Sequence, residues 1–224
     1  MTFLAWILSP LIWLMGQVLS GLTSLSGSPG AAIILLGVVF SLLILPLQRW
    51  ASRRESAYEV RSMEARCRVA PLRATLRGEA LFLATEKIYK DLNYHPIQAV
   101  AASAGFLVML PVLISGLLLL TNLPEASCRP FGFIADLCQP DGALGGINVL
   151  PLAMLGLNVA DALTRPGYAG PAKLRSIAVT ALVTGLVYGF GAGVVLFWIA
   201  ANATGFVMGR VFPVKPVTPS MPGT

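Results

Sequence analysis

A polar stretch from Arg49 to His95 interrupts a sequence that is otherwise largely apolar. It holds ten of the sixteen Lys and Arg residues and six of the ten Asp and Glu residues, whereas the 48 residues before it carry no charged side chain. Long apolar runs resume after it. Because charges are costly inside a bilayer, this stretch must lie in water. It therefore fixes the side of the membrane on which the neighbouring segments end.

The composition places the chain among integral membrane proteins. Hydrophobic residues make up 56% of the sequence and charged residues 12%, about half of the roughly 25% that is usual in soluble domains. The net charge of +6 does not indicate nucleic acid, because no basic stretch is interleaved with aromatic side chains for base stacking. We expect one all-α integral membrane domain with no nucleic-acid partner.

Five apolar runs have the character of membrane-spanning helices. The first of them covers about 25 Å at 1.5 Å per residue, near the short end of what crosses a bilayer. We expect spans at residues 31–47, 99–121, 146–163, 176–190 and 192–209. The later spans are connected by two loops, at 122–145 and 164–175. A Pro-rich tail at 210–224 follows the last span, and we expect it to be disordered.

Residues 1–23 are apolar and admit two interpretations. They lack the positively charged start of a signal peptide. The segment could span the membrane. It could also lie in the interface as an amphipathic helix, because Gln17 and Ser20 recur at helical spacing opposite Leu14 and Val18. The following run SLSGSPG, residues 24–30, is expected to break the helix.

Residues 48–98 are expected to form a helical hairpin, because they contain two amphipathic segments separated by a turn signal. Proline disrupts a helix interior and glycine favours turns, so we expect Pro71 to kink the first helix and Gly78 to mark the turn. A plain solvated loop is the alternative. One face of the first helix carries Ala57, Val60, Cys67 and Ala70.

The basic residues predict the orientation of the chain. Ten lie in residues 49–95, three in 164–175 and two in the tail, whereas the loop at 122–145 has only Arg129. Basic residues concentrate on the cytoplasmic side of membrane proteins. The hairpin, the loop at 164–175 and the C-terminus are therefore expected to be cytoplasmic, with the loop at 122–145 outside.

The cysteines and the single histidine limit the chemistry of the chain. Cys128 and Cys138 fall on the oxidising side, so they could form a disulfide, whereas Cys67 is expected to be reduced. There is no Cys/His cluster, no Ser/His/Asp set, no pair of carboxylates for acid/base catalysis and no phosphate-binding loop. We expect no metal, no cofactor and no enzymatic activity.

Uncharged polar side chains recur in the cytoplasmic half of the expected spans. In a membrane such groups face a bundle interior or a water-filled space, or they bond neighbouring helices. The first reading predicts a polar substrate groove that is open to the cytoplasm and closed toward the outside. Its candidate residues are Ser41, Ser103, Asn158, Thr180, Thr184 and Asn202. Ser115 is the clearest polar residue of an outer half, and Asp161 is the only charge inside a span.

Several motifs along the chain carry a family resemblance. They are WILSPLIWLMGQVLSGLTSLSGSPG at the start, GVVFSLLILPLQ with Pro46, IYKDLNYHPIQ, LVMLPVL, GFIADL, INVLPLAM, and GFGAGVVLFWIAAN ending at Asn202. In this order and spacing they resemble the YidC/Oxa family of membrane protein insertases, over roughly residues 4–212.

The resemblance implies a five-span helical core, a cytoplasmic hairpin and an outer interfacial helix at residues 1–23, in a multi-pass protein of the bacterial inner (plasma) membrane. It further implies insertion of nascent or small membrane proteins through the groove, in contact with membrane lipids and without nucleotide hydrolysis. One departure bears on function. Ser41 stands where bacterial members usually have a groove arginine, so it cannot attract acidic substrate tails.

Three functions follow from these features. The first is an insertase or membrane chaperone. The second is an accessory subunit that keeps the fold but binds one dedicated membrane partner, an alternative that the missing arginine favours. The third is a small-solute or lipid transporter, which would also need a polar cavity.

Overall fold

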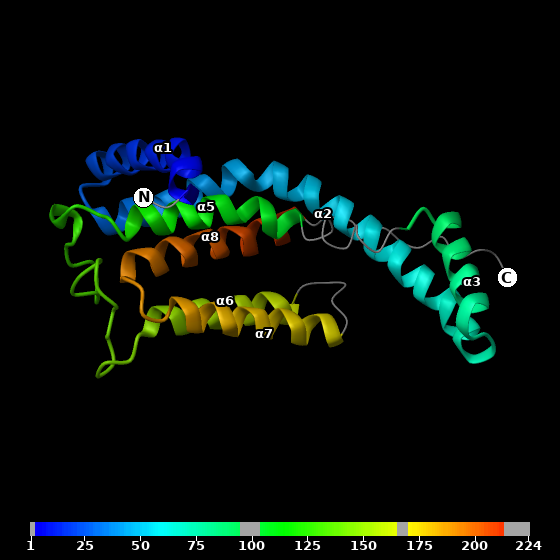
Figure 1. Cartoon of the computed structure of the whole chain (residues 1–224). Coiled ribbons are helices and arrows are strands. Elements are labelled where there is room, and N and C mark those ends of the chain that lie inside the picture. Colours follow the sequence, from blue (N-terminus) through cyan, green and yellow to red (C-terminus); the bar gives the residue numbers. More distant parts are fainter. Residues whose placement is uncertain (1–2, 95–103, 165–169, 213–224) are drawn as a thin grey trace. The chain divides into compact units, whose positions relative to one another are not determined.

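The computed structural model describes residues 3–94, 104–164 and 170–212, and within them the chain is all-helical (Figure 1). The expected all-α class is thereby confirmed. Two isolated bridges, Phe131 with Ile134 and Leu144 with Ile147, are the only β-type pairings in these ranges. The elements are α1 (Phe3–Ser26), α2 (Pro29–Thr75), α3 (Gly78–Asp91), α5 (Ala104–Leu120), the 3₁₀-helix η1 (Glu125–Ser127), α6 (Val149–Thr164), α7 (Gly170–Val187) and α8 (Ala192–Val211).

Within the described ranges, three segments are long and apolar enough to cross a membrane, judged by length and composition: Trp6–Ser26, Pro29–Trp50 and Ala192–Val211. Shorter apolar helices are Leu110–Leu120, Val149–Thr164 and Ser176–Val187. The chain thus has several candidate spans. The expected span at 99–121 falls partly on residues outside the described ranges.

The first expected span ends at Leu47, where the charged stretch begins, but the helix in the structure does not end there. α2 continues past Leu47 into the charged stretch and through Pro71 to Thr75. The turn of the hairpin falls at Leu76 and Arg77, and Gly78 adopts a positive φ of 63° there. A helix that leaves the bilayer needs no break, because water solvates its charged side chains while its backbone stays hydrogen-bonded within the helix.

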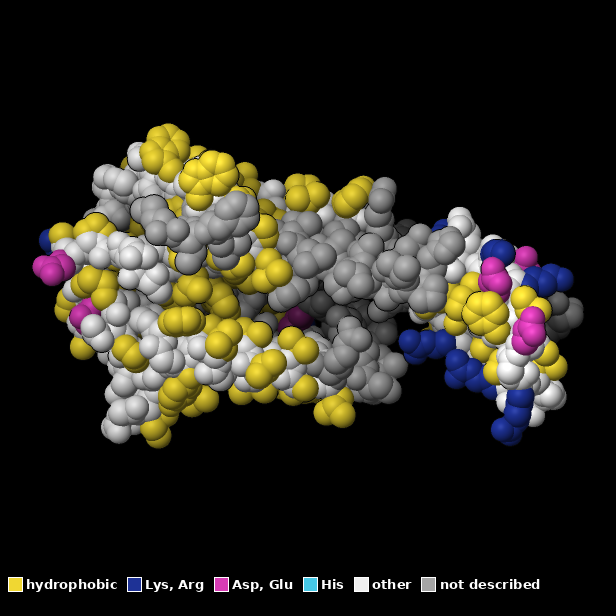
Figure 2. Space-filling view, viewed as in Figure 1, with side chains coloured by type: hydrophobic (Ala, Val, Ile, Leu, Met, Phe, Trp, Pro, Cys, Tyr) yellow, Lys and Arg dark blue, Asp and Glu magenta, His cyan; other side chains and the backbone are white. Residues whose placement is uncertain are grey.

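The chain divides into two compact units. The core unit comprises Met1–Leu45 and Leu110–Pro213, and the hairpin unit comprises Pro46–Met109 and Val214–Thr224. Figure 2 shows hydrophobic side chains over much of the exposed surface of the core unit and Lys and Arg side chains on the hairpin unit. This distribution suits a core surrounded by lipid and a hairpin surrounded by water.

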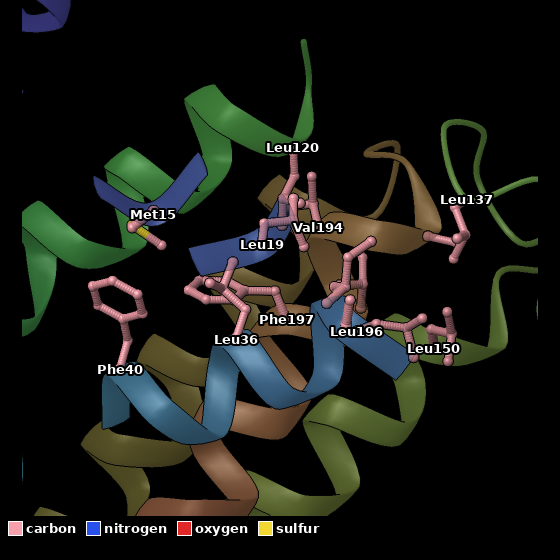
Figure 3. Packing of buried hydrophobic residues seen from close by; sticks show 14 of the residues in the cluster. Met15, Leu19, Leu36, Phe40, Leu120, Leu137, Leu150, Val194, Leu196 and Phe197 are labelled. Carbon is pink, nitrogen blue, oxygen red and sulfur yellow. The ribbon is translucent and has the colours of Figure 1, made fainter. Parts of the chain in front are cut away.

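The interior of the core unit is organised around α8. Phe197 is fully buried, and its neighbours from Ala192 to Leu196 are buried as well. Gly37 of α2 and Gly116 of α5 lie directly against Phe197, so the absence of a Cβ lets both helices approach α8 closely. Other side chains of the cluster come from α1, the loop between α5 and α6, and α6 (Figure 3), including Met15, Leu19, Leu137 and Leu150.

One face of α1 packs against the rest of the core unit, and the opposite face is exposed. Met15 and Leu19 are buried, and Gly16 approaches Leu119 of α5, with 3.6 Å from its ideal Cβ position to Leu119 Cδ1. Trp6 and Trp13 are exposed by 73% and 66%. Leu14, which the sequence placed on the apolar face, is 46% exposed, because the packed face is rotated toward Met15.

In the hairpin unit, α2 packs through residues that periodicity alone did not select. Ala65 and Val69 are buried one turn apart, whereas Cys67 and Ala70 are exposed. On α3, Leu81, Ala84 and Ile88 are half-buried. The buried face of α2 in this unit is therefore rotated away from the stripe that the sequence indicated.

Gly37 provides a test of the close packing between α2 and α8. A Cβ at this position would lie 2.7 Å from the carbonyl oxygen of Phe197 and 2.9 Å from the Cβ of Ala200. We expect Gly37→Ala to lower the free energy of unfolding by about 1–3 kcal/mol through overpacking, as measured by thermal unfolding in detergent. Gly205→Ala is the matched control, because nothing lies within 4 Å of a Cβ there. Equal stability of the two variants would contradict the packing.

Candidate substrate groove

The loop between α5 and α6 holds the start of α8 in place. The amides of Ala192 and Gly193 donate to the carbonyls of Gln139 and Leu137, both at 2.8 Å. A Cβ at Gly191 would lie 2.7 Å from the carbonyl oxygen of Cys138, so glycine is required for this approach. The first amides of a helix lack partners inside the helix, and here loop carbonyls supply them.

The same loop fixes the start of α6 and carries a disulfide. The Asp141 carboxylate accepts from the amide of Val149 at 2.6 Å. The side chain of Asn148 donates to the carbonyl of Tyr188 at 2.7 Å and accepts from the amide of Gly142 at 3.0 Å. Cys128 and Cys138, for which the sequence left a disulfide open, are joined in the structure. The end of the core unit that carries this loop is therefore extensively bonded.

Ser41 joins α2 to α8 rather than facing an open space. Its side chain is 5% exposed, and its Oγ donates to the carbonyl oxygen of Ala201 at 3.4 Å. The next residue of α8 is Asn202, which is half-buried. Ser41 therefore has the environment of a residue that bonds neighbouring helices.

The other candidate groove residues lie on α6, α7 and α8, and α6 packs against both of the others. Asn158 donates to the carbonyl of Met154 in its own helix at 2.9 Å. Thr180 is half-buried and Thr184 is buried on α7. No hydrogen bond joins any two of the described candidates, and Ser103 lies outside the described residues. The helices are thus brought together without a direct polar link between the predicted groove residues.

Three buried side-chain polar atoms of the core unit have no hydrogen-bond partner among the described residues. They are the Ser115 Oγ on α5, the Thr184 Oγ1 on α7 and the Trp198 Nε1 on α8. Ser115 is fully buried and Thr184 is 5% exposed. A buried hydroxyl without a partner is costly unless water or a ligand satisfies it. Of these three, only Thr184 was among the candidates. Ser115 was identifiable as a polar residue in an apolar run, whereas no sequence signal indicated Trp198.

An apolar groove of about 440 Å³ lies between α2 and α8. Its lining comprises Ile34, Val38 and Leu42 of α2 and Leu196, Ile199, Ala200, Ala203, Thr204, Val207 and Met208 of α8. The hydroxyl of Thr204 donates to the carbonyl of Ala200 at 2.8 Å, so it presents no free donor to the groove. None of the predicted groove residues lines this space, which is therefore suited to hydrocarbon.

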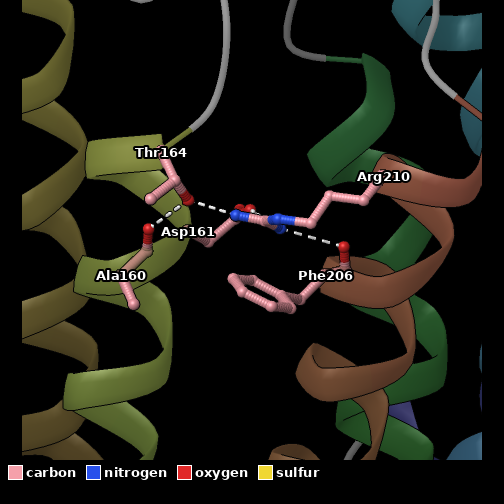
Figure 4. A network of polar contacts seen from close by, with 5 residues as sticks. All are labelled: Ala160, Asp161, Thr164, Phe206 and Arg210. Carbon is pink, nitrogen blue, oxygen red and sulfur yellow. Dashed lines mark hydrogen bonds and ion pairs between the residues drawn. The ribbon is translucent and has the colours of Figure 1, made fainter.

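An ion pair links the C-terminal ends of α6 and α8 (Figure 4). The Arg210 guanidinium lies 3.4 Å from the carboxylate of Asp161 and also donates to the Thr164 hydroxyl and, at 3.0 Å, to the carbonyl of Phe206. Its Cζ lies 3.4 Å from the ring centroid of Phe206. The sequence placed Arg210 in a disordered tail. α8 instead continues to Val211, because the carboxylate of Asp161 provides a partner for the charge.

Comparison with known proteins identifies a family over most of the chain. The family model described as the 60Kd inner membrane protein matches residues 21–213. The match includes the last residues of α1 and all of the helices from α2 to α8.

Individual relatives give a consistent result. The "Membrane protein insertase YidC" of Neisseria gonorrhoeae is 27% identical over 205 residues, which cover 88% of this chain and 34% of the relative. The protein of the same name from Legionella pneumophila has the same identity and coverage, and that of Neisseria meningitidis is 27% identical over 199 residues. The chain thus spans about a third of the length of the curated relatives it matches.

Thiol counting tests the disulfide. In denatured protein that has not been reduced we expect one reactive thiol, that of Cys67, and three after reduction. Replacing Cys128 and Cys138 by serine should lower the free energy of unfolding by about 3 kcal/mol, because the loop that holds α8 is no longer closed. Three reactive thiols before reduction would contradict the structure.

A double-mutant cycle tests the ion pair of Asp161 and Arg210. We expect Asp161→Asn and Arg210→Gln to lose stability by non-additive amounts, with a coupling of about 1 kcal/mol, as measured by unfolding in detergent. Glu86 and Lys90 on α3 serve as the control pair at 2.7 Å, and a pair of this i,i+4 type contributes about 0.3–0.5 kcal/mol. Additive losses at positions 161 and 210 would contradict an energetic link between α6 and α8.

Proposed function

The chain belongs to the YidC/Oxa family of membrane insertases, the 60Kd inner membrane protein family, and we propose on this premise that it inserts short membrane proteins without nucleotide hydrolysis. The family resemblance carried by the sequence motifs is confirmed. Because the chain covers about a third of its curated relatives, its activity and its clients are part of the proposal. Nascent or small membrane proteins are the proposed clients.

The proposed arrangement has five spans and one interfacial helix. The apolar part of α2 and the helices α5, α6, α7 and α8 are the spans, with the C-terminus and the hairpin in the cytoplasm. Fifteen of the sixteen basic residues then lie on the cytoplasmic side. α1 lies in the outer interface, where its exposed Trp6 and Trp13 suit headgroup depth.

The observation that carries the proposed mechanism is the unpartnered hydroxyl of Thr184. It is buried in α7 within a unit that is otherwise packed with apolar side chains. Thr184 lies three residues before the end of α7 at Val187, the end that adjoins the loop between α5 and α6. Water entering from the cytoplasmic side would therefore have to reach through most of the depth of the core unit to satisfy it. A hydrated groove shortens the hydrocarbon path of a client's polar end, and a single charge at the bilayer centre costs about 2.5–3.5 kcal/mol on insertion scales. The outer loop, with its disulfide and its caps on α6 and α8, keeps the opposite end closed.

A second function is favoured by the surroundings of Ser41. This residue is buried and donates its hydrogen bond to the backbone of α8. A site without a fixed positive charge suits a dedicated membrane partner as well as a range of clients. Co-purification separates the two functions, because a stoichiometric membrane partner supports the accessory role and a mixture of short membrane proteins supports the insertase.

Thr184→Val tests the hydrated groove. Valine has nearly the shape of threonine and removes only the unpartnered hydroxyl. We expect insertion of a single-span client with a short polar outer tail to fall several-fold in reconstituted vesicles, while thermal stability stays unchanged or rises because a desolvated polar group is lost.

Thr204→Val is the matched control for this substitution. Its hydroxyl is bonded within α8, so its removal should leave insertion unchanged. Normal insertion by Thr184→Val, or an equal loss in both variants, would contradict the role of Thr184. Absence of insertion by the wild-type protein would favour the accessory function.

A further inference from the structure

The hairpin unit presents more positive charge than its own acidic residues neutralise. Between Arg61 and Asp91 there are seven Lys and Arg residues and four Asp and Glu residues, a net charge of +3. Two cations are paired within their helices, Arg68 with Glu64 at 2.6 Å and Lys90 with Glu86 at 2.7 Å. The cations without an ion pair among the described residues are Arg61, Arg66, Arg73, Arg77 and Lys87, all of them exposed.

The same unit also exposes large apolar side chains. Phe82 is 66% exposed and Leu83 55%, both in the middle of α3. Leu83 and Lys87 are one helical turn apart, so they share a face. Figure 2 shows hydrophobic side chains at the surface of the hairpin with both acidic and basic side chains around them, and α3 itself carries Glu79 and Glu86. Exposed apolar side chains among cations are typical of surfaces that bind the headgroup region of a membrane.

We propose that the hairpin unit binds the anionic phospholipid headgroups of the membrane in which the protein resides, through its exposed cations Arg66, Arg73, Arg77 and Lys87 and its exposed apolar side chains Phe82 and Leu83. Charge complementarity selects this partner, because each cation near an anionic bilayer raises binding roughly fivefold. Phe82 and Leu83 then enter the boundary between headgroups and acyl chains. Nucleic acid fits less well, because Phe82 is the one aromatic residue among these six.

Chain connectivity favours the same partner. α2 passes from the apolar segment Pro29–Trp50 into the hairpin without an interruption. The hairpin is therefore tethered at a bilayer and meets lipid headgroups at high effective concentration. Pro46 lies inside α2 at this junction, and a proline lets a helix bend there.

A spin label on the full-length protein tests the proposal. Cys67→Ser removes the exposed thiol, the other two cysteines are joined, and Leu83→Cys provides the attachment site. The labelled protein is reconstituted in nanodiscs of phosphatidylcholine, or of phosphatidylcholine with about one-third phosphatidylglycerol. Collisions of the label with a water-soluble nickel complex and with oxygen are measured by power saturation.

In the anionic nanodiscs we expect several-fold fewer collisions with nickel and more collisions with oxygen. Both changes should reverse at high salt, because exposed charges are then screened. Arg66→Gln with Arg73→Gln and Arg77→Gln should abolish the difference between the two lipids, since three lost cations weaken binding roughly a hundredfold. Ala74→Gln with Ala80→Gln, at exposed positions, adds polar side chains without changing charge and should retain the difference.

Two outcomes overturn the proposal. A label that is equally accessible to nickel in both lipids excludes binding to anionic headgroups. A label that is shielded in both lipids, and insensitive to the triple substitution, indicates cover by protein, either a second copy or another part of the chain. Insertion plays no part in this measurement, so a failure here is distinguishable from a failure of the proposed function.

Discussion

The core unit depends on how the first amides of α8 are satisfied. A bilayer offers no water to a backbone group, so each must find a partner in the protein. Leu137 and Gln139 provide the carbonyls, and the glycine at 191 lets the loop approach closely enough to do so. With its start held, α8 presents Phe197 to the glycines of α2 and α5. In the sequence, the disulfide-closed loop is followed two helices later by a glycine-rich turn. The contact between that loop and that turn explains why both are needed.

The sequence was sufficient to predict helices and less able to predict their ends and packed faces. Apolar runs indicated the all-α class because only helices satisfy the backbone across such lengths. The charged residues after Leu47 did not mark the end of a helix. They mark where the helix passes from lipid into water, and its backbone hydrogen bonds continue across that boundary. The buried face of a helix differed from the predicted face by a turn or less, as at Leu14 and Cys67. The periodicity of a helix does not say which other helix packs against it. The site was predictable only as polar residues at similar depth, and the network around Arg210 depended on a partner 49 positions away.

Polar groups of the core unit fall into two classes, and the difference bears on function. Ser41, Asn158, Thr204 and the pair of Asp161 and Arg210 have partners within the protein. Their hydrogen bonds or ion pairs either join two helices or lie within one helix. Such groups stabilise the fold without requiring water. Ser115, Thr184 and Trp198 have buried polar atoms without partners. A fold that retains such atoms accepts a cost in stability, which is the pattern expected where a protein must admit water or a polar segment.

The absence of a positive charge at Ser41 changes what such a groove can recognise. A fixed cation would attract acidic client tails and would leave a costly charge in the core whenever no client was present. Ser41 avoids this cost by bonding the backbone of α8, and Arg210 is already occupied by Asp161. If the chain inserts clients as proposed, its selection among them would then depend on the cost of desolvating the tail. Neutral tails should cross more readily than acidic ones, because a charged tail costs more to desolvate and no fixed cation in the groove offsets that cost.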